Sequence, residues 1–208
     1  MRQPKIVIIN FNIGNLRSLW NSITRIGYRK LQLTGNPKEI EKADILILPG
    51  VGNFAQCMNN LRARNLEKLL ATEVLEKHKP ILGICAGMQL LASESEENGL
   101  QKGLGFISGS VVSLRINGNL PVPHNGWNNL SFLPKANPDY KYNFEDKHFY
   151  FNHSYHLKCN QKYVIASVKY SKKIVAVIQK DNIYGVQFHP EKSQKIGLQF
   201  LDFFFKNV

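Results

Sequence analysis

Three short apolar runs in the first half of the chain limit its fold more than any other feature. They lie at residues 5–10, 44–48 and 81–84, and none alternates apolar with polar side chains. Strands of this kind are buried on both faces, as in parallel sheets covered by helices. Segments with apolar residues at helical spacing lie between and around them, at 16–26, 54–61 and 66–74. The alternation of strand and helix predicts an α/β fold with an open parallel sheet.

The second half of the chain has a different pattern. Short β-like segments are separated there by turn residues, at 109–114, 128–132, 149–151, 163–169, 175–179 and 183–187. The polar stretch 134–147 is expected to be a loop, and 196–204 an amphipathic helix whose phenylalanines face the core. We therefore expect a mixed, largely parallel sheet flanked by helices, with short antiparallel additions, in one domain over residues 1–208.

Composition indicates a globular protein. Hydrophobic residues make up 43% of the chain and charged residues 20%, and no apolar run approaches the roughly 18 residues that span a bilayer. The first residues lead into a strand-like segment without the pattern of a signal peptide. The three cysteines are widely spaced, which argues against a zinc ribbon or a disulfide framework. We expect a cytoplasmic protein that needs no metal or other cofactor.

The net charge of +12 raises the question of nucleic-acid binding. Lysine and arginine are scattered, and the densest basic runs, 77–79 and 169–173, are short. Neither resembles a recognition helix, and no aromatic RNA-binding strand is visible. A basic surface that is solvated, or that complements an acidic partner, is the better interpretation.

Cys85 is the strongest candidate for a reactive group. It directly follows the third apolar run, has Gly83 and Gly87 on either side, and precedes a helix-like segment. Glycines at these positions permit a tight strand-to-helix turn that exposes a nucleophile. The positive end of the following helix would favour a thiolate. Alternatively, a lone cysteine is often only a small buried hydrophobic residue.

A candidate base lies in the tripeptide His189-Pro190-Glu191. Proline drives the preceding residue into an extended conformation. Positions two apart then face the same side, which brings the Glu191 carboxylate beside the His189 imidazole. The carboxylate would fix the imidazole tautomer and stabilise its charge. None of the other histidines has a carboxylate in this arrangement; they are His78, His124, His148, His153 and His156.

Two further segments have a weaker signal. The Pro-Gly-Val-Gly sequence at 49–52 ends an apolar run, and its backbone N–H groups could bind a developing oxyanion. The acidic run 94–97 is expected to be a solvated helix face, although one of its carboxylates could hold an ammonium group.

Together these segments resemble the class I glutamine amidotransferases, a family that implies a flavodoxin-like fold. The matching sequences are GICAGMQ at 83–89 and QFHPE at 187–191. Further segments resemble, within that class, the glutaminase subunits of imidazole glycerol phosphate synthases: GNLRS at 14–18, LPGVG at 48–52, VPHNGWN at 122–128 and FYFNHSY at 149–155. The resemblance covers essentially the whole chain.

The resemblance implies a reaction and a set of residues. Cys85 would attack the side-chain amide of L-glutamine, with His189 moving the proton and Glu191 supporting it. Other positions would bind the substrate or its oxyanion: Gly50, Gly52, Ala86, Gln89, Glu97, Ser154 and Tyr155. The family passes the ammonia to a (β/α)₈ cyclase subunit in histidine biosynthesis, and four residues would face that partner: His124, Trp127, Tyr150 and Lys192.

Several alternatives stay open at this point. A paralogous glutaminase subunit could supply ammonia for amidation of a bacterial surface sugar. A cysteine hydrolase of the same architecture could act on other substrates without a partner. A non-catalytic binding subunit would also account for the basic charge.

Overall fold

The computed structural model describes residues 3–13, 16–116 and 120–208. Its larger sheet has nine strands in the order β2-β1-β3-β4-β13-β12-β11-β8-β9. The first part of this order is parallel and consists of β2 (Leu31–Thr34), β1 (Ile6–Ile9), β3 (Ile45–Leu48), β4 (Ile81–Ile84) and β13 (Ile183–Val186). Such an order is typical of flavodoxin-like sheets. The parallel strands predicted from the apolar runs are confirmed.

The remainder of the larger sheet is antiparallel. It consists of β12 (Lys172–Lys180), β11 (Val164–Tyr170), β8 (His124–Phe132) and β9 (His148–His153). Tight turns join β11 to β12 and β12 to β13, and connections this short require antiparallel neighbours. The antiparallel additions predicted for the second half are confirmed, and they are longer than the sequence pattern indicated.

A second sheet, which the sequence pattern did not reveal, has the strand order β10 (Tyr155–Cys159), β7 (Ile107–Ser113), β5 (Ala92–Ser95) and β6 (Gln101–Lys102). The expectation of a helix face at 94–97 is wrong, because Glu94 and Ser95 belong to β5. The helix after Cys85, α5 (Ala86–Leu90), ends before this run. Strand β5 is stabilised by pairing with β6 on one side and with β7 on the other. The pairing with β7 cannot be recognised from the residues of β5 alone.

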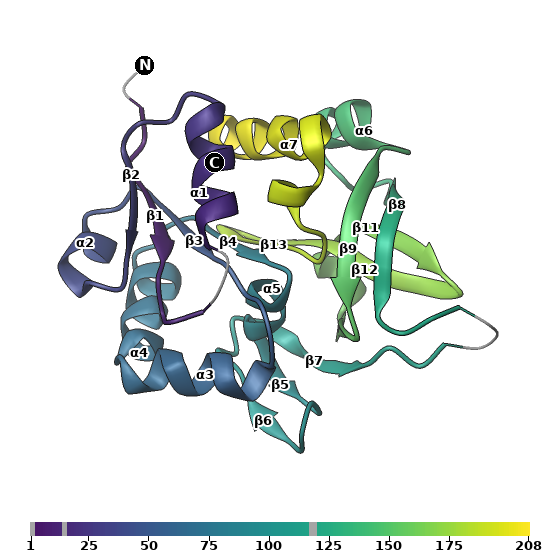
Figure 1. Ribbon diagram of the computed structural model, residues 1–208, viewed down its shortest axis with the longest axis horizontal. Helices are drawn as coiled ribbons and strands as arrows, with labels where there is room; N and C mark the ends of the chain where they lie inside the picture. The colour runs from purple at the N-terminus through teal and green to yellow at the C-terminus, as the bar shows by residue number, and fades with distance from the viewer. Residues whose placement is uncertain (1–2, 14–15, 117–119) are drawn as a thin grey trace.

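Helices cover both faces of the larger sheet (Figure 1). One face has α1 (Leu16–Arg25) and α7 (Gln194–Asn207), and the other has α2 (Pro37–Glu41), α3 (Phe54–Ala63) and α4 (Leu66–Ala71). Within β1, Ile6 and Ile8 pack towards the first face, and Val7 and Ile9 towards the second. Successive strand residues point to opposite faces, so burial on both sides explains the unalternated apolar runs.

Helix α6 (Pro138–Phe144) lies in the stretch 134–147 that was expected to be a loop. The Asn137 side chain caps it, and Tyr140 and Phe144, one helical turn apart, are buried. Phe144 lies against Phe200 of α7, with ring centroids 5.3 Å apart. The loop prediction is wrong. Most residues of this stretch are polar, and they hid the helical spacing of the two buried residues, Tyr140 and Phe144.

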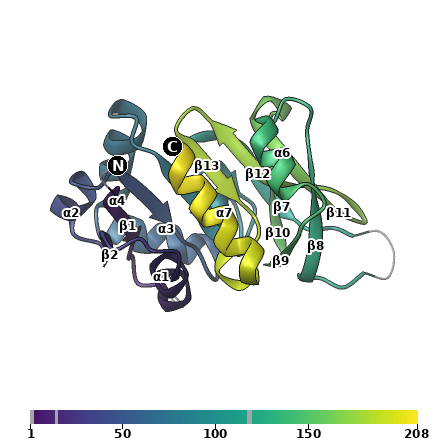
Figure 2. The same cartoon turned by 90° about the horizontal axis from the view of Figure 1, so that it is seen from above.

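The carboxyl ends of β3, β4 and β13 meet at one edge of the sheet, where ligands bind in folds of this kind. Seen from above, α7 lies across β13 (Figure 2). A π-helical turn (Thr72–Glu76) follows α4, and 3-10 turns lie at Gln161–Tyr163 and Pro190–Lys192. The prediction of one domain fits a sheet in which β13, from the end of the chain, lies between β4 and β12. Among the described residues, no helix is both long and apolar enough to cross a bilayer.

Candidate active site

Cys85 occupies a sharp turn between β4 and α5. Its backbone has φ 54° and ψ −113°, a conformation that residues with side chains rarely adopt. The Cys85 N–H donates to the Val186 carbonyl at 2.8 Å and so continues the pairing of β4 with β13. A Cβ at Gly87 would lie 1.9 Å from the Leu48 carbonyl oxygen, and one at Gly83 would lie 2.7 Å from the Gly87 carbonyl oxygen. The predicted glycine-flanked turn is confirmed, and the strained backbone at its apex is typical of a functional residue.

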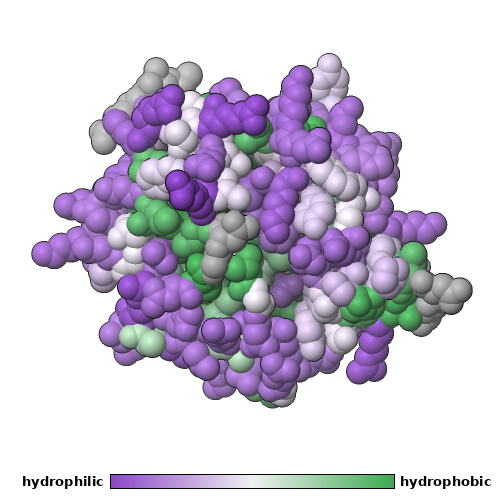
Figure 3. Space-filling view, in the orientation of Figure 1, coloured by the Kyte–Doolittle hydropathy of each residue, from purple (hydrophilic) through white to green (hydrophobic). Residues whose placement is uncertain are grey.

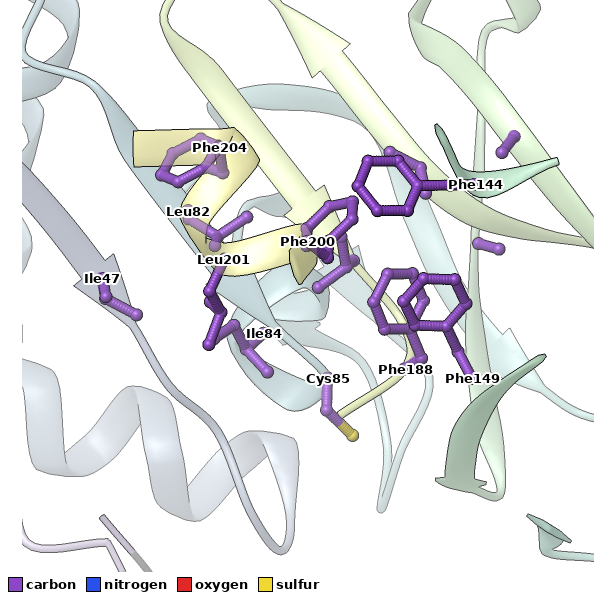
Figure 4. Close-up of a cluster of buried hydrophobic side chains, with 14 of the residues drawn as sticks. Ile47, Leu82, Ile84, Cys85, Phe144, Phe149, Phe188, Phe200, Leu201 and Phe204 are labelled. Atoms are coloured by element: carbon purple, nitrogen blue, oxygen red, sulfur yellow. The ribbon is translucent and has the colours of Figure 1, made fainter. Parts of the chain in front are cut away.

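The Cys85 sulfur lies at the border between the apolar core and a polar pocket. Figure 4 shows Cys85 below a cluster of buried side chains that includes Ile84 and Phe188, with its sulfur directed away from them. Besides His189, two polar groups contact the sulfur: the Asn152 carbonyl and the Gln187 Nε2, each at 3.8 Å. The side chain is only 6% exposed, so access to the sulfur is through the pocket.

His189 and Glu191 lie side by side, as the tripeptide predicts. His189 is extended, with φ −102° and ψ 99°, and its Nδ1 lies 2.9 Å from Glu191 Oε1. A carboxylate only accepts hydrogen bonds, so Nδ1 must carry the proton. This leaves Nε2 as the ring nitrogen that interacts with Cys85. Both side chains are buried, which strengthens their interaction.

The surroundings of His189 stabilise its protonated form. Burial alone would lower its pKa, but the charge of Cys85, a hydrogen bond to Cys85 and the Glu191 carboxylate outweigh burial and raise the pKa to about 10. At neutral pH this keeps the imidazole protonated beside Cys85. A positively charged imidazole beside the sulfur is the arrangement that activates a cysteine nucleophile.

A pocket of about 430 Å³ opens over the Cys85 sulfur, a size within the range of small-molecule sites. Its lining includes most of the predicted site residues: Gly52, Cys85, Ala86, Gln89, Glu97, Ser154, Tyr155, His189 and Lys192. Four more lining residues, Val51, Pro123, Asn152 and His153, belong to segments that the sequence analysis quoted but had no individual role in the predicted site. Residues far apart in the chain thus surround one small polar space.

The loop at 49–52 packs against the turn that carries Cys85. A Cβ at Gly50 would lie 2.1 Å from the Gly87 nitrogen and 2.7 Å from the Ala86 Cβ, so Gly50 allows this close approach. Gly50 itself is beneath the pocket lining, whereas Gly52, with φ 95°, lies on it. The predicted proximity of this loop to Cys85 is confirmed.

Glu97 reaches the pocket from the connection that follows β5. Its Oε2 accepts the Phe54 N–H at 2.8 Å, at the first residue of α3. The other carboxylates of the acidic run bind elsewhere: Glu94 accepts from Ser110 Oγ, and Glu96 accepts from the Ser113 N–H. Only Glu97 of the three lines the pocket.

Gln187 is a site residue that the sequence analysis missed. Its side chain is fully buried and contacts both the Cys85 sulfur and the Gln89 side chain. A signal was present, because Gln187 lies two residues before His189 in an extended segment. The rule that placed Glu191 beside His189 applies equally to Gln187.

His124 does not face outward, against the expectation that it contacts a partner. It is 1% exposed, and its ring stacks on Tyr170 with centroids 3.9 Å apart. Its Nδ1 lies 3.0 Å from His153 Nε2, and its Nε2 lies 3.1 Å from Asn128 Nδ2. Burial lowers the pKa of His124 to about 4. The strand alternation that buries Phe151 on the paired strand also buries His124, so this residue supports the surface from beneath.

The other three residues predicted to face a partner form one cluster. Trp127 is 43% exposed, and its ring lies 6.0 Å from that of Tyr150. The Lys192 Nζ lies 5.7 Å from the centroid of the Tyr150 ring, and the Tyr150 hydroxyl donates to Asn125 Oδ1 at 2.7 Å. Lys192 also lines the pocket, so the cluster begins at the site itself. Of the motif at 14–18, Gly14 and Asn15 lie outside the described residues.

Comparison with known proteins decides the family. Residues 7–208 match the family described as glutamine amidotransferase class-I. The chain belongs to the class I glutamine amidotransferases. It is therefore an enzyme of that family, and the family predicted from the GICAGMQ and QFHPE segments is confirmed.

Proteins from several organisms have sequences similar to this chain. A protein of Vibrio vulnificus named imidazole glycerol phosphate synthase subunit HisH 2 is 49% identical, covering 94% of this chain and 91% of that one. Subunit HisH 1 of Campylobacter jejuni is 45% identical, covering 96% and 98%. Subunit HisH 2 of Methanococcus maripaludis is 42% identical, covering 98% and 100%. These names do not support the surface-sugar alternative.

Solved structures confirm the amidotransferase fold. A glutamine amidotransferase crystal structure superposes with a TM-score of 0.75 at 18% identity, covering 98% of this chain and all of that one. A glutamine amidotransferase from Thermotoga maritima superposes with a TM-score of 0.65 at 16% identity, covering 99% of this chain and 85% of that one. At these identities the likeness concerns the fold alone.

Proposed function

We propose that the chain hydrolyses L-glutamine to glutamate and ammonia through a thioester on Cys85. One observation carries this proposal: a cysteine on a strained turn lies with a His189–Glu191 pair at one polar pocket. A nucleophile, a base and a group that orients the base are the elements of covalent acyl transfer.

In the proposed reaction, Cys85 starts as a thiolate and His189 as an imidazolium. The sulfur attacks the amide carbon, and backbone N–H groups of the 49–52 loop and of Ala86 stabilise the oxyanion that forms. His189 gives its proton to the leaving nitrogen, which departs as ammonia while the C–N bond breaks. His189 then takes a proton from water and the hydroxide attacks the thioester carbon. The C–S bond breaks, which releases glutamate with a new C–O bond and returns the sulfur as thiolate. The proton on His189 restores the starting pair.

The amino-acid end of the substrate is bound by other residues of the pocket lining. The Glu97 carboxylate attracts the α-ammonium group, since it is a charged acceptor on the lining. Gln89, Ser154 and Tyr155 also line the pocket and complete the binding of this end. A substrate held there presents its side-chain amide to Cys85.

The ammonia is used by a partner subunit. Ammonia that is released into neutral water becomes protonated and is then no longer nucleophilic. A second active site must therefore receive the ammonia directly. The similar proteins are named subunits of imidazole glycerol phosphate synthase. We infer a heterodimer with a (β/α)₈ cyclase that makes imidazole glycerol phosphate and aminoimidazole carboxamide ribotide in histidine biosynthesis.

Apolar side chains on the surface support a docking role. Figure 3 shows apolar side chains gathered at the centre and at the right-hand edge of an otherwise hydrophilic face. The large apolar residues exposed in the described ranges include Leu120, Val122 and Trp127. Exposed apolar groups with a polar rim are typical of protein interfaces.

The test combines this chain with the cyclase subunit of the same organism and its phosphorylated ribulosyl substrate. Wild-type chain with glutamine should yield imidazole glycerol phosphate. Cys85→Ala should abolish that synthesis, and ammonium chloride should restore it. Absence of glutamate release by the wild-type complex would refute the glutaminase assignment. Glutamate release without imidazole glycerol phosphate would refute the acceptor alone.

A further inference from the structure

Gln187 connects the nucleophile to the substrate-binding end of the pocket. Its side chain is fully buried, and its main-chain N–H donates to the Ala176 carbonyl at 2.9 Å, which ties it to β12. The Oε1 of Gln187 accepts from Gln89 Nε2 at 3.0 Å, and its Nε2 points at the Cys85 sulfur at 3.8 Å. Both ends of one amide are therefore engaged.

The orientation of both amides follows from their partners. Gln89 Nε2 donates to the Tyr155 carbonyl at 2.8 Å, and a carbonyl only accepts. The same nitrogen also faces Gln187, so that contact must be made by the Gln187 oxygen. The Gln187 nitrogen is then left to face the sulfur. Reversing the Gln187 amide would set two donors against each other at Gln89 and an oxygen against the thiolate.

This arrangement has two chemical consequences. An N–H directed at sulfur stabilises the thiolate more than the thiol, because donors favour the charged form of an acceptor. The Gln89 nitrogen is engaged by Tyr155 and Gln187, so its Oε1 is the atom left to interact with the pocket. Gln89 and Glu97 both line the pocket, and a fixed carbonyl oxygen together with a carboxylate can accept from a donor group such as an α-ammonium.

We propose that Gln187 is a positioning residue with two roles: it donates to the Cys85 thiolate, and it fixes Gln89 with its oxygen towards the substrate ammonium. The second role rests on the proposed glutaminase function. The first role concerns the free chain alone and can be measured without any substrate.

Two variants separate the roles. Gln187→Met keeps the volume but removes both the donor and the acceptor. Gln187→Glu keeps an acceptor for Gln89 but replaces the donor with a carboxylate that repels the thiolate. Gln179→Met, an equivalent change on β12 next to Tyr184, is the control and should behave as wild type.

The first measurement is the pH dependence of Cys85 alkylation by iodoacetamide, read by peptide mass spectrometry. Burial raises the pKa of Cys57 and of Cys159 to about 11, so these two cysteines remain thiols in the assay range. Gln187→Met should shift the Cys85 profile upward by about one pH unit, and Gln187→Glu by more. An unchanged profile in both variants would overturn the first role.

The second measurement is glutamine hydrolysis in the complex. Gln187→Met should lower kcat and raise KM, each roughly tenfold. Gln187→Glu should lower kcat further while KM stays near that of the wild type, because Gln89 keeps its partner. A merely structural role predicts equal losses in both variants and no shift in the alkylation profile. Should Gln187→Met fail to fold, Gln187→Leu, which also lacks the donor and the acceptor, takes its place. A shifted profile with no wild-type hydrolysis of glutamine would refute the proposed function and leave the thiolate contact standing.

Discussion

Tyr150 and His189 are joined through their main chains. The His189 N–H donates to the Tyr150 carbonyl at 2.9 Å, and the Tyr150 N–H donates to Ser193 Oγ at 3.0 Å. The Ser193 hydroxyl donates in turn to the His189 carbonyl at 2.7 Å. The proposed base is thus held by the strand whose Tyr150 side chain lies beside the exposed Trp127. A partner that contacts this surface would act on the position of the base through a single residue.

Ser193→Ala should loosen His189 without touching the pocket. The change removes two hydrogen bonds of a fully buried hydroxyl, which should lower the free energy of unfolding by about 1–3 kcal/mol. Glutamine hydrolysis should fall roughly tenfold in kcat, with KM nearly unchanged. Ser131→Ala on the exposed side of β8 is the control. Wild-type kcat in Ser193→Ala would show that these bonds do not position the base.

The hydrogen bond of Glu97 to Phe54 and its proposed role in substrate binding can be separated by substitution. Glu97→Gln keeps an oxygen that accepts the Phe54 N–H, so stability should stay near wild type. It removes the charge that attracts an ammonium group, so KM for glutamine should rise by a factor of about 10 or more, on the order of a charge-assisted hydrogen bond. Glu97→Ala should also lose about 1 kcal/mol of stability, because the Phe54 N–H loses its acceptor. Equal KM in Glu97→Gln and wild type would contradict the substrate role, and Glu96→Gln is the control.

Gly50→Ala should damage the site through contact alone. The added Cβ would lie 2.1 Å from the Gly87 nitrogen, so the loop or the Cys85 turn must move. We expect a loss of about 2–3 kcal/mol in the free energy of unfolding, as for overpacking of a core, and loss of most hydrolysis. Gly99→Ala, where a Cβ meets nothing but φ is 92°, should cost only about 1–2 kcal/mol of backbone strain. Similar costs for the two variants would contradict the contact.

The protonation of His189 should make the free energy of unfolding fall as the pH becomes alkaline. Its folded pKa of about 10 lies above the ordinary value of 6.5, so folding favours the protonated ring. This stabilisation is complete below pH 6.5 and is lost as pH rises through 10. The difference in unfolding free energy between wild type and His189→Asn should therefore shrink between about pH 7 and pH 10. Urea titrations across this range measure it, and a constant difference would contradict a raised pKa.

Replacing Glu191 tests the origin of the raised pKa. Glu191→Gln keeps an oxygen that accepts from His189 Nδ1 but removes the charge, which should lower the pKa of His189. The alkaline limb of the pH–rate profile should move to lower pH, and kcat should fall less than in His189→Asn, because Glu191 orients the ring without transferring the proton. An unmoved limb would assign the raised pKa to Cys85 alone.

The sequence by itself determined the features that depend on near neighbours. Unalternated apolar runs predicted the parallel strands, and glycines on either side of Cys85 predicted the turn. Proline at 190 predicted that His189 and Glu191 share one side. In each case a steric or conformational rule acts within a few residues, so the local chain contains the full information.

Only the tertiary structure decided which groups meet. The pairing of β4 with β13 brings Cys85, His189 and Gln187 together, and the pairing of β8 with β9 buries His124 instead of exposing it. The acidic run became part of a strand because β6 and β7 offered backbone partners to β5. These outcomes depend on hydrogen bonds and packing between segments distant in the chain, and no local pattern of residues specifies such partners.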